Sequence, residues 1–218
     1  MVRVALFFAL VTTTCGLARA DVIFSDLGGS YPTGGSLNLG VSGGGPGTGD
    51  NVWSMGFTAG ATYDVTQIDV ALTDFSVSGG KAIVSLWTDS SGTTPGMRLV
   101  GAEWNVAVPS SGLTTINGIT GITLDSGASY FLQIAPGSTT VSVSWYYNNQ
   151  SINGPVYVDD VAARYGESLG NTTLGAFDVL GTPVTTSVPE FSALNPDALA
   201  LLGFGLLCVA EIRRRKSA

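Results

Sequence analysis

The stretches Ile68–Thr73 (IDVALT) and Ala82–Trp87 (AIVSLW) decide the fold class of this chain. In the first stretch, a large apolar residue occupies every second position, with polar or small residues between. In the second stretch, Ala82, Val84 and Leu86 fall on one face and alternate with Ile83, Ser85 and Trp87 on the other. A period of two residues predicts a β-strand with one face in a core and the other toward solvent.

Seven more stretches have this strand character, and turn-forming Gly, Pro, Asp and Ser residues separate them. They are Asn51–Thr58, Leu99–Val106, Ile119–Leu124, Tyr130–Ala135, Val141–Tyr147, Val156–Val161 and Ala176–Leu180. We therefore expect an all-β domain, a two-sheet antiparallel sandwich of jelly-roll type. The glycine-rich segment 28–49 is predicted to be a long surface loop.

The composition excludes several kinds of chemistry. The chain has no histidine, and its two cysteines, Cys15 and Cys208, lie in the terminal segments. Ser-His-Asp and Cys-His catalysis and Cys/His zinc sites are therefore excluded for the domain between them. Residues 21–187 carry three basic and thirteen acidic side chains, a formal charge of −10. We expect no nucleic-acid partner, because such binding needs many Lys and Arg contacts to phosphate, and we expect no metal or cofactor.

The N-terminus has the features of a secretory signal peptide. Arg3 supplies the charged region, Val4–Val11 the apolar region, and Ala18 and Ala20 the small residues of an A-x-A cleavage site. Residues 1–20 are therefore predicted to be removed, so that Asp21 becomes the first residue of the mature protein.

The last thirty residues have the features of a membrane stop signal. The motif Val188-Pro189-Glu190 is followed by an apolar run, and then by the basic residues Arg213, Arg214, Arg215 and Lys216. We expect a short transmembrane helix over about residues 198–212, with the basic tail 213–216 on the cytoplasmic side. The apolar run 198–210 spans only ~20 Å as a helix, against a hydrocarbon core of ~30 Å, so the arginines must snorkel.

This tail resembles the PEP-CTERM sorting signal of Gram-negative bacteria, in which Val-Pro-Glu-Pro precedes a short helix and an arginine cluster. Phe191 stands where that family has its second proline. The resemblance implies a precursor anchored in the inner membrane, an exosortase-type processing enzyme as partner, and delivery to the cell envelope or extracellular matrix. The expected organisation is a signal peptide over 1–20, a sandwich over 21–187 and the sorting signal over 188–218.

A second resemblance covers most of the predicted sandwich. Residues 51–58 (NVWSMGFT), 84–89 (VSLWTD) and 124–132 (LDSGASYFL), together with Pro95-Gly96, look like the choice-of-anchor domains, notably the R type. Those domains are secreted β-sandwiches attached by alternative C-terminal anchors. The resemblance implies a fold and no particular activity.

The carboxylates are compatible with two enzyme classes, an aspartic protease and a glycosidase. The stretch Ile122–Ser129 (ITLDSGAS) is similar to the signature of retropepsin-like aspartic proteases, for which a homodimer would have to pair two Asp125 side chains. The favoured interpretation is instead a hairpin turn between strands that end at Leu124 and begin at Tyr130. A glycosidase would need two facing carboxylates, one of which Glu103 could supply.

The aromatic residues suggest a binding role. In the stretch Val141–Tyr147, Trp145 shares a face with the valines and is predicted to lie inside, whereas Tyr146 shares a face with the serines. Exposed rings can stack on sugars, so Tyr146 is the candidate glycan contact.

The expected function is that of a non-catalytic, exported surface or extracellular-matrix protein. The alternative is a carbohydrate-binding module with extracellular polysaccharide as its partner. A further alternative is a dimeric aspartic protease or a glycosidase. No catalytic residue is assigned.

Overall fold

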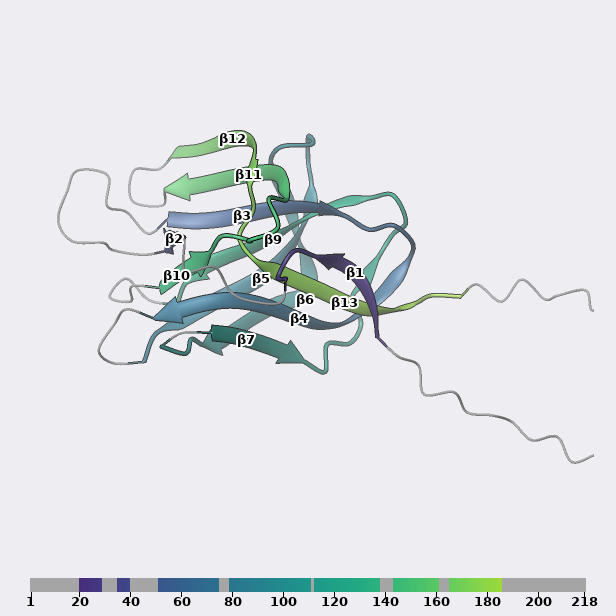
Figure 1. The fold of residues 1–218 in the computed structure, drawn as a ribbon. Coiled ribbons are helices and arrows are strands. Elements are labelled where there is room, and N and C mark those ends of the chain that lie inside the picture. Colours follow the sequence, from purple (N-terminus) through teal and green to yellow (C-terminus); the bar gives the residue numbers. More distant parts are fainter. Residues whose placement is uncertain are drawn as a thin grey trace, which may run out of the picture. The chain divides into compact units, whose positions relative to one another are not determined.

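The computed structural model describes residues 20–28, 35–39, 51–74, 79–110, 112–137, 143–160 and 165–185. Strands in this part of the chain form two antiparallel sheets, as the alternation predicts (Figure 1). The first sheet contains β1 (Asp21–Ser25), β2 (Ser36–Leu39), β4 (Tyr63–Asp74), β7 (Gly112–Asn117), β8 (Thr123–Leu124), β10 (Val143–Tyr146) and β13 (Phe177–Pro183). The second contains β3 (Asn51–Thr58), β5 (Lys81–Asp89), β6 (Pro95–Ala107), β9 (Ser129–Pro136), β11 (Asn153–Asp160) and β12 (Tyr165–Thr173).

Strand β4 organises the first sheet because it is paired along both edges. Its residue Val70 pairs with Phe177 of β13 on one side and with Thr114 of β7 on the other. Further along, β4 pairs with β10, and near its start it pairs with β8. Strand β1 joins the far edge of β13, so the first and last strands of the described chain lie side by side (Figure 1).

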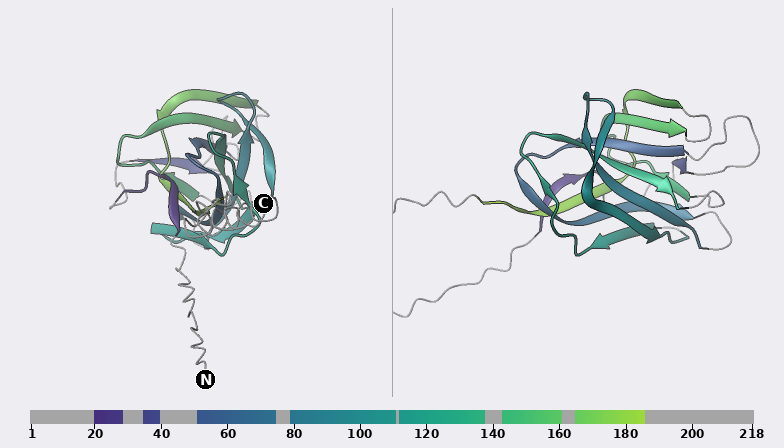
Figure 2. Two further views of the ribbon diagram at one scale, coloured as in Figure 1. Left: turned by 90° about the vertical axis from the view of Figure 1, so that its right-hand side faces the viewer. Right: turned by 180° about the vertical axis from the view of Figure 1, so that it is seen from behind.

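The second sheet has the strand order β12-β11-β3-β9-β5-β6. The two sheets enclose the interior between them, as the end-on view in Figure 2 shows. Their inward residues form one core of fully buried side chains. It includes Ile68, Val70, Leu72, Met55, Val84, Leu86, Leu132, Ile134 and Trp145.

The outer face of β4 is more buried than its alternation predicts. Asp69 is 6% exposed and Ala71 is fully buried. The chain that follows β1 passes over this face, and Leu27 packs there against Ala71 and Ala176 with Tyr146 beside them. Because this face is covered, a polar residue that the alternation places on the outside, such as Asp69, is nevertheless buried.

Several strand boundaries differ from the prediction. Segment 28–49, expected to be a loop, contains β2, whose Leu37 and Leu39 are buried. The expected strand Ile119–Leu124 is reduced to β8, because Gly118 and Gly121 have positive φ values of 70° and 74° that extended strands do not adopt. Strands β1, β7 and β12 were not predicted. The polar sequence of β12 lacks apolar alternation and takes its conformation from its hairpin partner β11.

Glycine 175 tests how tightly the core is packed. A Cβ at Gly175 would overlap the Trp145 ring, which is fully buried and donates from Nε1 to the Ala176 carbonyl at 3.0 Å. We expect Gly175→Ala to lower the free energy of unfolding by about 1–3 kcal/mol because the core has no space for the methyl group. The measurement is urea unfolding followed by tryptophan fluorescence.

Gly60→Ala is the matched control. A Cβ at Gly60 has open space around it, so this variant should unfold within about 0.5 kcal/mol of wild type. Equal stability of the two variants would show that the Trp145 pocket yields to an added methyl group.

Candidate functional site

The outer face of the second sheet carries a row of polar residues across four neighbouring strands. Ser85 of β5 pairs with Gln133 of β9, which pairs with Ser54 of β3, which pairs with Tyr157 of β11. Their sequence neighbours point into the core, so this row lies on the opposite side of the sheet. The four side chains therefore form one continuous strip.

Hydrogen bonds hold this strip in place. Trp87, two residues after Ser85 on the same face, donates from its indole Nε1 to Ser85 Oγ at 2.8 Å. Gln133 donates from Nε2 to Ser54 Oγ at 3.1 Å. Both serines are buried, whereas Trp87 and Gln133 are half-buried. The half-buried Trp87 and Gln133 side chains each donate a hydrogen bond to the hydroxyl group of a buried serine.

Tyr157 lies at the other end of the strip. A Cβ at Gly166 of β12 would overlap the Tyr157 hydroxyl group, so the ring extends across β12 at a position that has no side chain. Tyr157 is half-buried. The glycine therefore allows the tyrosine ring to lie along the sheet instead of standing away from it.

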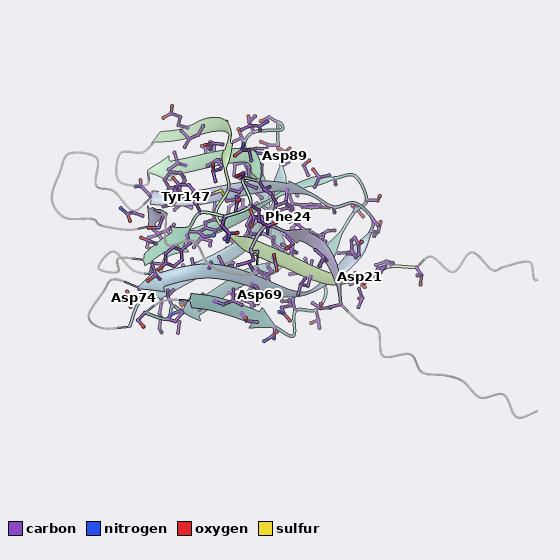
Figure 3. The ribbon with its side chains drawn as sticks, in the orientation of Figure 1. Asp21, Phe24, Asp69, Asp74, Asp89 and Tyr147 are labelled. Atoms are coloured by element: carbon purple, nitrogen blue, oxygen red, sulfur yellow. The ribbon has the colours of Figure 1, made fainter. Side chains whose placement is uncertain are left out.

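A cavity of about 260 Å³ lies beside the polar strip, where residues of β9, β3 and β11 line it. Phe131, the cross-strand neighbour of Trp87, lines it together with Gly56 and Pro155. The β5–β6 hairpin forms another wall through Asp89 and Gly92, and Phe24 of β1 is a further lining residue (Figure 3 labels Asp89 and Phe24).

The hairpin wall of the cavity is held by its own hydrogen bonds. The Asp89 carboxylate accepts from the Ser91 amide at 2.9 Å and from the Gly92 amide at 2.7 Å. This Asx-type turn fixes the loop beside the cavity. Polar groups also line the cavity, where the hydroxyl groups of Thr58 and Ser129 lie 3.1 Å apart.

An ion pair borders the outer face at strand β6. Arg98 contacts Glu103, and each side chain is about half exposed. Arg98 is the cross-strand neighbour of Trp87, and Glu103 that of Ser85. The glycosidase candidate Glu103 is thus held by a cation at the edge of the sheet.

A second group of titratable residues lies on the first sheet. Asp26 is fully buried, and its Oδ1 accepts from the Phe177 amide at 2.6 Å. Its Oδ2 has no hydrogen-bond partner among the described residues. Burial is the main cause that raises the pKa of Asp26 to about 7; the Phe177 bond opposes this increase, and the Asp178 carboxylate adds to it.

The structure places the aromatic candidates of β10 on opposite faces, as predicted. Trp145 is fully buried in the core. Tyr146 lies on the outer face of the first sheet, half-buried, and packs against Leu27, Ala71 and Ala176. The candidate glycan contact Tyr146 is therefore on the sheet opposite the polar strip.

Asp125 lies in a turn, which is the interpretation that the sequence favours. The Ala128 amide donates to the Asp125 carbonyl at 3.2 Å, and Gly127 has a φ of +74°. The turn is not a hairpin, however, because it leads from β8 in the first sheet to β9 in the second. Asp125 is exposed, and its amide donates to the Tyr130 hydroxyl oxygen at 2.8 Å.

The predicted targeting residues fall mostly beyond the described ranges. Ala20 directly precedes β1, while Ala18 lies outside the described residues. So do the sorting motif Val188, Pro189 and Glu190 and the basic residues Arg213, Arg214, Arg215 and Lys216.

Trp87 is among the aromatic residues of the sequence that could stack on sugars, but the prediction selects Tyr146 and does not include Tyr157. In Ala82–Trp87, the indole falls on the same face as Ser85 and on the face opposite Val84 and Leu86. Tyr157 likewise alternates with Val156 and Val158. An aromatic residue on the polar face of a strand is the pattern that identifies both.

A comparison of the chain with protein-family models and with curated proteins finds no match. Within the ranges that the structure describes, no group of three or more histidine, cysteine, aspartate or glutamate residues could hold a metal ion. In the same ranges, no helix has the length and apolar character needed to cross a membrane.

The pKa of Asp26 predicts a pH-dependent stability. Between about pH 4, near the ordinary pKa of 3.8, and pH 7, the folded protein binds more protons at Asp26 than the unfolded chain. The contribution of Asp26 to the free energy of unfolding therefore falls as the pH rises through this window. We expect Asp26→Asn, which cannot ionise, to be more stable than wild type at pH 8 by on the order of 2 kcal/mol, measured by urea unfolding.

The same pair of proteins at pH 3.5 is the internal control. There Asp26 is protonated in the folded state and mostly protonated in the unfolded chain, so the difference between wild type and Asp26→Asn should shrink to little more than the effect of the amide. A difference that stays constant from pH 3.5 to pH 8 would contradict the raised pKa.

Proposed function

We propose that the chain is a non-catalytic surface or extracellular-matrix protein, exported as a precursor and delivered by its PEP-CTERM-like tail. The observation that supports this proposal is the pairing of β1 with β13, in which Asp21 lies opposite Gly181. Removal of residues 1–20 and cleavage near Val188–Glu190 would leave both strands intact. The jelly-roll-like sandwich would then keep all of its described strands when it is transferred.

The order of events follows from the two targeting segments. The signal peptide directs the chain across the inner membrane, and the basic tail 213–216 stops transfer with the arginines in the cytoplasm. An exosortase-type enzyme then cuts near Val188-Pro189-Glu190 and releases or transfers the sandwich to the envelope or matrix.

The structural role is supported by how the sandwich is stabilised. The domain between the targeting segments contains no cysteine, so its stability outside the cell depends on packing of the two sheets and not on disulfides. The two carboxylates considered for catalysis do not face each other in a cleft of the kind that either enzyme class needs. Asp125 is in an exposed turn, and Glu103 contacts Arg98. These positions favour a structural or binding role over catalysis.

Processing of the tail tests the proposal. One epitope is placed in the β5–β6 hairpin after Gly92 and a second after Lys216, and the full chain is produced in a host that contains an exosortase. We expect the two epitopes to separate, with the C-terminal fragment in the membrane fraction. Phe191→Pro should increase the cleaved fraction severalfold because it restores the family motif, as measured by quantitative blotting.

Neutral replacement of Arg213–Lys216 is the companion variant. It should reduce retention of the precursor in the inner membrane, because the stop signal loses its cytoplasmic anchor. The sorting proposal fails if wild type and Phe191→Pro both remain full-length membrane proteins that carry both epitopes.

A further inference from the structure

We propose that the outer face of the second sheet binds an uncharged polysaccharide, with Trp87 and Tyr157 stacking on sugar rings and Gln133 hydrogen-bonding between them. The site consists of these three residues and the buried serines Ser85 and Ser54. The inference goes beyond the proposed function, which concerns how the sandwich reaches the cell surface and not what it holds there.

The two aromatic rings are placed for stacking before any ligand arrives. The bond from Trp87 to Ser85 Oγ ties the indole to the sheet, and the space over Gly166 receives the Tyr157 ring. Both rings are half-buried, so each keeps part of its surface accessible. A fixed ring loses little conformational entropy on binding, and its apolar face matches the apolar face of a pyranose.

The spacing of the rings suits a polymer better than a single sugar. Trp87 is on β5 and Tyr157 on β11, with β9 and β3 between them. Three strand intervals correspond to about 14 Å across the sheet, a span of a few sugar units. A monosaccharide could contact only one ring, whereas an extended chain can contact both.

Gln133 supplies the polar contact between the rings. Its Nε2 donates to Ser54 Oγ at 3.1 Å, which fixes the amide orientation and leaves the carboxamide oxygen as an acceptor for a sugar hydroxyl group. Trp87 and Gln133 therefore use the same arrangement, a half-buried contact group held by a buried serine. Two such pairs, Trp87 with Ser85 and Gln133 with Ser54, lie on neighbouring strands.

Charge disfavours a polyanion. Ser54, Ser85, Gln133, Trp87 and Tyr157 carry no formal charge at neutral pH, and the nearby Arg98 is neutralised by Glu103. The domain as a whole has a formal charge of −10, which repels polyanions. The cavity lined by Phe131, Gly56 and Pro155 adds a hollow beside the strip.

Affinity electrophoresis of the full chain tests the proposal. The protein is extracted in a detergent without a sugar headgroup and run on native gels that contain xylan, mixed-linkage β-glucan, galactomannan or the polyanion alginate. We expect at least one uncharged polymer to retard wild type. Trp87→Ala and Tyr157→Ala should each weaken this binding by roughly five- to tenfold, because each removes one stacked ring.

Matched variants separate this site from general effects. Tyr146→Ala removes an aromatic ring from the outer face of the other sheet, so retardation should not change. Gln133→Glu replaces the amide with a charge of nearly the same shape and should weaken binding without removing a ring. Thermal unfolding shows which variants are folded, and if Trp87→Ala is not, Tyr157→Ala and Gln133→Glu decide.

The proposal is wrong if none of the uncharged polymers retards wild type, or if alginate alone does. It is also wrong if folded Trp87→Ala, Tyr157→Ala and Gln133→Glu all bind as wild type does, or if Tyr146→Ala is the variant that loses binding. Epitope separation in the processing experiment does not depend on any of these outcomes, so the two proposals can fail separately.

Discussion

The pairing of β4 along both of its edges is the constraint on which the first sheet depends. This twelve-residue strand receives β13 and β10 on one side and β7 and β8 on the other. Its inward residues Ile68, Val70 and Leu72 are fully buried against the second sheet. The same strand therefore sets the strand order of its sheet and contributes buried residues to the core. The domain between the terminal segments contains no cysteine, so no disulfide can replace these contacts.

The two outer faces of the sandwich have different characters. On the first sheet, the chain after β1 crosses the face and buries Ala71 beneath Leu27. On the second, Trp87, Gln133 and Tyr157 are half-buried, beside the buried serines Ser85 and Ser54. A covered face contributes to stability, whereas an accessible one that carries ordered polar and aromatic groups is suited to binding.

The alternation of apolar residues was enough to predict the sheets, because strands β3, β5 and β9 have one face in the core and the other outside. It could not predict β2 or β12. The first is four residues long within a glycine-rich segment, and the second is a polar edge strand that depends on β11. The polar strip could not be predicted for a related reason. Alternation places Trp87 on the outer face, but only the register across β5, β9, β3 and β11 shows that Gln133 and Tyr157 share it.

The position of β13 inside the first sheet has a mechanical consequence. A chain held by its C-terminal tail would receive any pulling force at Pro183, the end of a strand that is hydrogen-bonded to β1 on one edge and to β4 on the other. A pull along the strand loads both ladders in shear, so that many hydrogen bonds share the force instead of opening one at a time. Forced unfolding is governed by the rate at which such contacts rupture together. A sandwich pulled through an inner strand is thus suited to resisting mechanical force.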